Sequence, residues 1–133
     1  MVGLVVVSHS AKAAEGIAEV ATQMGSADAE IVPAGGGPDG EVGTSADRIR
    51  EAIEAADAGD GVVVLVDLGS AVMNAELALE MLDAEGSDIA VEIADAPILE
   101  GTLNAAVTAA GSKATVESVV ASAQEAWDYR KLN

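Results

Sequence analysis

A chain of 133 residues is long enough to bury the core of one domain, and we expect a single domain over residues 1–133. Its 23 acidic residues against 6 basic ones give a net charge of −17, which excludes the basic patch that nucleic-acid binding requires. Because there is no cysteine, disulfides and thiolate metal sites are excluded, and no apolar stretch has the length of a membrane span.

The acidic residues are spread along the chain, and their mutual repulsion opposes compaction unless concentrated salt screens it. We therefore expect a halophilic source. The apolar run Gly3–Val7 lacks the charged start of a signal peptide and is followed at once by Ser8 and His9. These features predict a cytoplasmic protein.

Four short β-branched runs have the nearly continuous apolar character of strands buried on both faces of a parallel sheet. They are Gly3–Val7, Ala29–Pro33, Gly61–Val66 and Asp88–Ile93. Between and after them, helical periodicity predicts helices over Ala11–Met24, Ser45–Ala58, Ala71 to about Ala84, and Ile98–Ala110. Each helix is followed by a glycine suited to a helix end, namely Gly25, Gly59, Gly86 and Gly111.

A fifth helix is predicted near the end of the chain, with Arg130 and Lys131 in a last turn where cations complement the helix dipole. Its predicted buried stripe is Val116, Val119, Val120, Ala123 and Trp127. The order βαβαβαβαα indicates an α/β fold, an open parallel sheet with helices on both faces. In such folds ligands bind beyond the carboxyl ends of the strands.

The histidine His9 directly follows the first predicted strand, and Ser10 can cap the helix after it. A helix N-terminus opposes protonation of a nearby imidazole and favours an anion, so a neutral, nucleophilic ring is plausible here. Asp67 ends the third strand at the equivalent position, where its carboxylate can accept a hydrogen bond from the ring and select its tautomer. The alternatives are a loop histidine without a role and an aspartate that merely ends a strand before a turn.

The loop AGGGPDGEVGTS contains five glycines, whose bared N–H groups can hold phosphate oxygens, although a generic flexible loop is the alternative. Thr44 or Ser45 can cap the next helix, and Thr44 with Asp47 matches a capping box. The literal G-x-G-x-x-G of this loop follows the second strand and is interrupted by Pro38, which excludes a dinucleotide site. One histidine without cysteine makes no zinc site, and no GK[ST] loop is present, so we expect no metal and no bound cofactor.

Four motifs resemble, in order, those of the DhaM family, the enzyme IIA-like phosphotransferase subunits of phosphoenolpyruvate-dependent dihydroxyacetone kinase. They are VVVSHS at 5–10, GTS at 43–45, DLGSAVMNAE at 67–76 and APILEGTLNAAV at 96–107. The resemblance extends more distantly to the enzyme IIA domains of mannose-type sugar phosphotransferase systems. It implies a four-stranded parallel sheet in the order 2-1-3-4, usually in a homodimer.

The resemblance also implies that His9 accepts a phosphoryl group from phospho-HPr and passes it to ADP. ADP and Mg are expected on a DhaL subunit, and dihydroxyacetone on a DhaK subunit. Asp67 would orient His9, while the residues expected to bind the phosphoryl group are Ser10, Gly35, Gly43, Thr44, Gly69 and Ser70. The rival hypotheses are a mannose-type sugar enzyme IIA and a non-enzymatic flavodoxin-like module that binds an anion or a partner protein.

Overall fold

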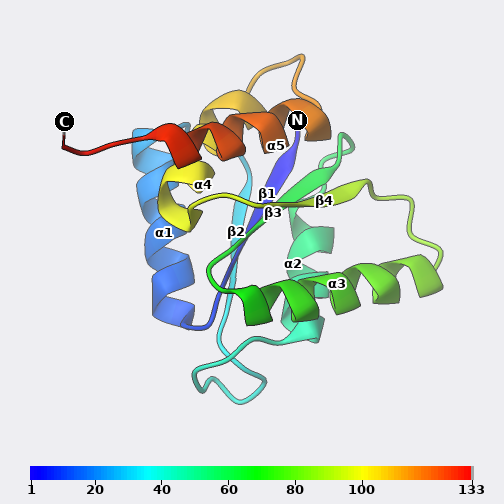
Figure 1. The fold of residues 1–133 in the computed structure, drawn as a ribbon. Coiled ribbons are helices and arrows are strands. Elements are labelled where there is room, and N and C mark those ends of the chain that lie inside the picture. Colours follow the sequence, from blue (N-terminus) through cyan, green and yellow to red (C-terminus); the bar gives the residue numbers. More distant parts are fainter. Residues whose placement is uncertain (133) are drawn as a thin grey trace.

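The computed structural model describes residues 1–132, in which strands and helices alternate along the chain (Figure 1). The strands are β1 (Gly3–Ser8), β2 (Ile31–Gly35), β3 (Val62–Val66) and β4 (Val91–Ala94). The helices are α1 (Ala11–Met24), α2 (Ala46–Ala56), α3 (Gly69–Ala84), α4 (Ile98–Ala109) and α5 (Val116–Gln124), followed by a short 3-10 turn η1 (Glu125–Asp128). All strand pairs are parallel and the order is β2-β1-β3-β4, which confirms the predicted α/β class, topology and strand order.

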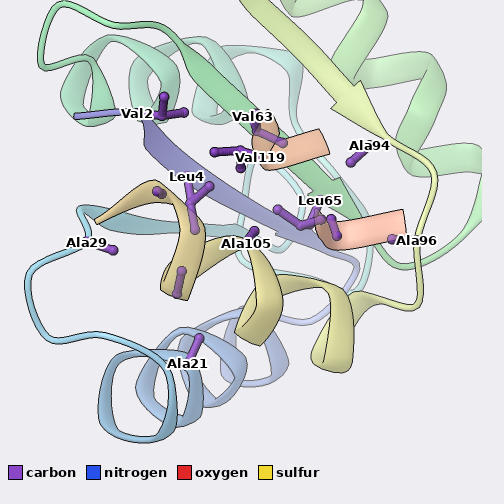
Figure 2. Close-up of a cluster of buried hydrophobic side chains, with 13 residues drawn as sticks. Val2, Leu4, Ala21, Ala29, Val63, Leu65, Ala94, Ala96, Ala105 and Val119 are labelled. Atoms are coloured by element: carbon purple, nitrogen blue, oxygen red, sulfur yellow. The ribbon is translucent and has the colours of Figure 1, made fainter. Parts of the chain in front are cut away.

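Helices cover both faces of the sheet, with α2 and α3 on one face and α1, α4 and α5 on the other (Figure 1). Side chains that follow one another along a strand point to opposite faces, so the central strands feed two separate cores. In β1, Leu4 packs with the α1, α4 and α5 side, whereas Val5 packs against α2 and α3. Figure 2 shows the first of these clusters, in which Leu4, Val63 and Val119 meet alanines from α1 and α4.

Small residues allow these layers to approach closely, since the chain has no phenylalanine and its helices turn mainly alanine toward the sheet. At Gly3 of β1, a Cβ would collide with the carbonyl oxygen of Ala56 at the end of α2. A residue without a side chain is therefore needed where β1 passes α2. Among residues 1–132, no helix is both long enough and apolar enough to cross a bilayer.

The outer strands differ from their predicted bounds. β2 begins at Ile31 and continues to Gly35, two residues later at both ends than predicted, because its register with β1 pairs Leu4 with Ile31 and Ser8 with Gly35. Pro33 is tolerated within it because β2 is an edge strand. β4 begins only at Val91, since its pairing with β3 starts there, and it ends at Ala94 rather than at 93.

The helix ends confirm some predicted caps and correct others. Ser10 caps α1 through a hydrogen bond from the Ala13 N–H, and Gly25 follows the helix as predicted. The capping box of Thr44 with Asp47 is wrong, because Ser45 caps α2 and accepts from the Arg48 N–H.

The bounds of α2 and α3 differ in part from the predicted ones. α2 ends at Ala56, two residues earlier than predicted, with Asp57 as its C-cap, and Gly59 lies in the loop beyond with a φ of +108°. α3 begins at Gly69, two residues earlier than predicted. It ends as predicted before Gly86, whose φ of +77° lets the N–H groups of Gly86 and Ser87 bond back to the last turn.

The fifth helix is shorter than predicted, because α5 gives way to the tighter turn η1 at Glu125. The change from 3.6 to 3.0 residues per turn rotates the buried stripe, so Ala126 is buried and Trp127 is 60% exposed. The prediction of a buried Trp127 was therefore wrong. Arg130 and Lys131 lie beyond both elements and do not complement a helix dipole; Lys131 instead pairs with Glu100 of α4 at 2.8 Å.

Candidate functional site

The candidate site lies at the end of the sheet where β1 and β3 finish and where α1 and α3 begin (Figure 1). These two strands are neighbours, and their register pairs Val7 with Val66. Ser8 and His9 at the end of β1 therefore lie beside Asp67, the residue after β3. The long loop between β2 and α2 passes the same end of the sheet, as expected from the shared direction of the strands.

The imidazole of His9 is held by the carboxylate of Asp67. Nδ1 of His9 lies 3.0 Å from Oδ1 of Asp67, so the predicted hydrogen bond is present. An ionised carboxylate only accepts hydrogen bonds, so Nδ1 carries the proton and donates it to Oδ1. This tautomer leaves the lone pair of the neutral ring on Nε2.

Asp67 receives hydrogen bonds on both of its oxygens. Oδ2 accepts from the hydroxyl of Ser8 at 2.9 Å and from the backbone N–H of His9 at 3.0 Å. Oδ1 accepts from the N–H of Leu68 at 2.8 Å in addition to the His9 ring. Burial raises the pKa of Asp67, but the hydrogen bonds from the backbone and side chain of His9 and from Ser8 lower it, and the pKa lies below its ordinary value. Asp67 is therefore a carboxylate at neutral pH.

The other ring nitrogen faces the start of α3. Nε2 of His9 lies 2.7 Å from the hydroxyl of Ser70, the second residue of that helix. No side chain caps α3; the N–H of Ala71 donates to the carbonyl oxygen of Leu68, and the positive end of the helix dipole favours a negative charge at the N–H groups of Gly69 and Ser70. The His9 side chain is 21% exposed, which lets a molecule outside the protein reach it.

Three hydrogen bonds attach the loop between β2 and α2 to the site, the first of them from the Gly36 N–H to the carbonyl oxygen of Ser8 at 3.2 Å. The N–H of Gly43 donates to the carbonyl oxygen of His9 at 2.9 Å, and Gly43 has a φ of +152°, which side chains rarely adopt. The next residue, Thr44, accepts a hydrogen bond at its hydroxyl oxygen from the side-chain amide of Asn74 in α3, at 2.5 Å. The loop thus bridges His9 and α3.

Two of the predicted phosphoryl-binding residues have clear structural roles. The hydroxyl of Ser10 accepts the capping bond of α1, and its N–H donates to the hydroxyl of Ser8 at 3.1 Å. Gly35 is buried against the start of α1, where a Cβ would lie 2.6 Å from the carbonyl oxygen of Ser10. Contact of Ser10 or Gly35 with a phosphoryl group stays a prediction, as it does for Gly43, Thr44, Gly69 and Ser70.

The sequence model of one protein family, EIIA-man, described as the PTS system fructose IIA component, matches residues 3–120. The chain belongs to the EIIA-man family.

Two relatives of this EIIA-man chain are informative. The phosphoryl donor subunit DhaM of PEP-dependent dihydroxyacetone kinase from Escherichia coli strain K12 is 40% identical over 134 residues, which cover 98% of this chain and 28% of that protein. The chain thus spans only a little over a quarter of that relative. The subunit DhaM of PEP-dependent dihydroxyacetone kinase 2 from Listeria innocua is 39% identical over 107 residues, covering 80% of this chain and 85% of that protein.

The fold is also similar to a solved structure. The crystal structure of the protein of unknown function EF1359 superposes with a TM-score of 0.82 at 32% sequence identity, covering 99% of this chain and 98% of that one. The similarity includes the whole of the sheet and the helices on both of its faces.

Two polar residues of this EIIA-man site were missed in the sequence. Ser8 is 2% exposed and holds Asp67, and it could have been found because it adjoins His9 at the end of the strand beside β3. Asn74 holds Thr44, and its spacing of four residues from Ser70 places both on one side of α3. Among residues 1–132, no group of three or more His, Asp or Glu side chains could hold a metal ion.

Proposed function

We propose that the chain is a phosphoryl donor subunit of PEP-dependent dihydroxyacetone kinase and that Nε2 of His9 carries the phosphoryl group. One observation carries this proposal: Asp67 holds the ring at Nδ1, so that the lone pair of Nε2 faces the uncapped start of α3. The relatives with DhaM in their names, which include one that this chain covers over 85% of its length, support it.

In the first step, Nε2 of His9 attacks the phosphorus of a phosphohistidine on the carrier protein HPr. The phosphorus–nitrogen bond of the donor breaks and a bond from phosphorus to Nε2 forms, while the donor histidine recovers its lone pair. The proton on Nδ1 of His9 stays in place, so the phosphorylated ring is cationic. The carboxylate of Asp67, 3.0 Å from Nδ1, stabilises that positive charge.

In the second step, an oxygen of the terminal phosphate of ADP attacks the phosphorus and the bond to Nε2 breaks. The cationic ring is a good leaving group, because it recovers the neutral tautomer that Asp67 already favours. Phosphoryl transfer has a loose transition state, so catalysis consists mainly of positioning and charge stabilisation. The Ser70 hydroxyl and the first N–H groups of α3 supply donors for the phosphoryl oxygens.

The partners in this proposal are those that the resemblance to DhaM implies. HPr donates the phosphoryl group, a DhaL subunit holds ADP with Mg as the acceptor, and a DhaK subunit holds the dihydroxyacetone that is finally phosphorylated. The exposed edge of the His9 ring suits a relay that two proteins reach in turn. We include in the proposal a cytoplasmic location and a homodimer, whose molar mass in solution is measurable by light scattering.

The proposal is tested by incubating the protein with phosphoenolpyruvate, enzyme I and HPr and then measuring its intact mass. The expected result is the gain of one acid-labile phosphoryl group, absent from His9→Ala. Addition of DhaL with ADP should then remove the group and form ATP. If active carriers leave the mass unchanged, the proposal is wrong.

A second candidate is an enzyme IIA of a sugar phosphotransferase system, favoured by the family match, whose description names a fructose component. It uses the same His9 chemistry and differs in the acceptor. Transfer from phosphorylated His9 to an enzyme IIB domain, without transfer to DhaL with ADP, would establish this candidate. A protein that is never phosphorylated but binds an anion or a partner at the same loops would establish the non-enzymatic alternative.

A further inference from the structure

Asn74 lies on α3 one turn after Ser70 and is partly buried between that helix and the loop that precedes α2. Its side-chain Nδ2 donates to the hydroxyl oxygen of Thr44 at 2.5 Å. Residues four apart on a helix lie side by side, about 6 Å between their Cβ atoms. The Thr44 hydroxyl is therefore held one helical turn along from Ser70, the residue whose hydroxyl lies 2.7 Å from Nε2 of His9.

The direction of this hydrogen bond determines what the Thr44 hydroxyl offers to its surroundings. A threonine hydroxyl has one proton to donate and lone pairs to accept with, whereas the Nδ2 group of asparagine only donates. Because Asn74 donates to the Thr44 oxygen, the proton of the hydroxyl remains free for another acceptor. Asn74 thus leaves the Thr44 hydroxyl with its proton available to donate toward the site.

The same contact holds the backbone of the loop in place. Gly43 donates its N–H to the carbonyl oxygen of His9 at 2.9 Å, directly before Thr44 in sequence. The loop is therefore tied to His9 at Gly43 and to α3 at Thr44, so the separation between the loop and the ring is determined at both positions. If the bond to Asn74 is lost, Thr44 loses its tie to α3, while the backbone contacts of Gly43 with His9 and of Gly36 with Ser8 remain.

We propose that Asn74 is a positioning residue for phosphoryl transfer, which aims the Thr44 hydroxyl proton at an oxygen of the phosphoryl group on His9. This inference rests on the proposed function. A group bound to Nε2 projects from the ring toward the start of α3, where the Ser70 hydroxyl lies. Asn74 does not touch that group; it acts through Thr44, which donates from the neighbouring loop.

The test measures phosphorylation of the protein by phospho-HPr in single-turnover reactions, with the rate at saturating donor separated from the donor concentration at half-maximal rate. Asn74→Ala should lower the saturating rate by about tenfold, the usual effect of losing a residue that orients a contacting side chain. The half-saturating donor concentration should stay within about twofold of that of the unsubstituted protein. Asn74→Asp is nearly isosteric but accepts the Thr44 proton and adds a negative charge. It should therefore lower the rate more than Asn74→Ala does.

A double-mutant cycle with Thr44→Val decides whether Asn74 acts through Thr44. Valine preserves the shape of threonine without its hydroxyl, so Asn74→Ala should have almost no further effect on the rate in that background. Equal losses from Asn74→Ala in both backgrounds would overturn the inference, as would normal rates for Asn74→Ala and Asn74→Asp. Circular dichroism checks that each variant is folded, and Asn74→Asp and Thr44→Val retain the volume of the original side chains.

Asn104 supplies a matched control, because it is also a partly buried asparagine on a helix whose side-chain amide bridges to another element, here the carbonyl oxygen of Ser122. Asn104→Ala should leave the saturating rate unchanged.

The unsubstituted protein separates the proposed function from the inference about Asn74. If it is phosphorylated while the Asn74 variants match it, only the present inference fails, and if it is never phosphorylated, both fail.

Discussion

At the scale of single residues, the site depends on a carboxylate whose oxygens are filled by donors. Asp67 accepts from the hydroxyl of Ser8, from the ring and N–H of His9 and from the N–H of Leu68. An amide in place of the carboxylate has one donating group, which must face at least one of these donors. Where that group faces the ring, Nδ1 has to accept and the proton moves to Nε2, which blocks attack.

We predict that Asp67→Asn slows phosphorylation of His9 by about tenfold to a hundredfold, as loss of an orienting group does, while the fold is retained. The reason is loss of the tautomer and of the negative charge that stabilises the cationic ring. Rapid-quench measurement of the intact mass gives the rate. An unchanged rate would remove Asp67 from the proposed mechanism.

The same variant has a second readout in the dependence of stability on pH. The pKa of Asp67 is lowered in the folded protein, so the carboxylate contributes stability above its unfolded value of about 3.9. This contribution is lost as the pH falls through the folded pKa. The difference in unfolding free energy between the unsubstituted protein and Asp67→Asn should shrink as the pH falls below about pH 4. Urea titrations at several pH values measure it, and a difference that stays constant at low pH contradicts this linkage.

At the scale of elements, close packing of the layers makes the effect of replacing a glycine on the unfolding free energy depend on the atoms around it. Gly3 lies where a Cβ would collide with the carbonyl oxygen of Ala56, whereas Gly16, exposed in α1, has no atom near its Cβ position. We predict that Gly3→Ala lowers the unfolding free energy by about 1–3 kcal/mol, because β1 and α2 must separate. Gly16→Ala should raise it by up to about 1 kcal/mol through helix propensity.

Chemical denaturation of both variants gives the two free energies. The pair controls for the chemical change, since the same methyl group is added at both positions. Equal changes in unfolding free energy for Gly3→Ala and Gly16→Ala, whether gains or losses, would contradict the close approach of β1 to α2.

The elements also show what periodicity in a sequence predicts well and poorly. The bounds of α1 were predicted correctly because Ser10 and Gly25 mark both ends with local capping interactions. The start of β2 was predicted incorrectly, because strand pairing rather than apolar character determines where the hydrogen-bond ladder with β1 begins. The burial of Trp127 was predicted wrongly because the change of helical pitch at Glu125 depends on tertiary contacts. One of these is the hydrogen bond from the indole N–H of Trp127 to the carbonyl oxygen of Asp95.

At the scale of the whole molecule, the chain carries far more acidic than basic residues. Arg50 is surrounded by carboxylates, within 4 Å of Asp47, Glu54 and Glu85, and Lys131 pairs with Glu100. Such pairs can neutralise few of the 23 acidic residues, since the sequence has only 6 lysines and arginines. The net charge of −17 therefore leaves substantial repulsion in the folded state.

We predict that the midpoint of thermal unfolding rises steeply with salt. Raising KCl from about 0.01 M to about 1 M shortens the screening length from ~30 Å to ~3 Å, which removes most of the repulsion between surface carboxylates. Circular dichroism during heating measures the midpoint, and sucrose in place of salt controls for general solvent effects. A midpoint that is independent of salt would contradict the halophilic hypothesis.

The order of strands and helices, the placement of His9 and Asp67 at strand ends and the excess of acidic residues could be predicted from the sequence, because they depend on local patterns and composition. The tertiary structure determines which nitrogen of His9 carries the lone pair, since Asp67, the residue after β3, must approach Nδ1 from a segment 58 residues away. It also decided the contact of Asn74 with Thr44, which joins a helix to a loop 30 residues earlier. A hydrogen bond between distant segments depends on strand register and helix packing, and neither is encoded in a local pattern.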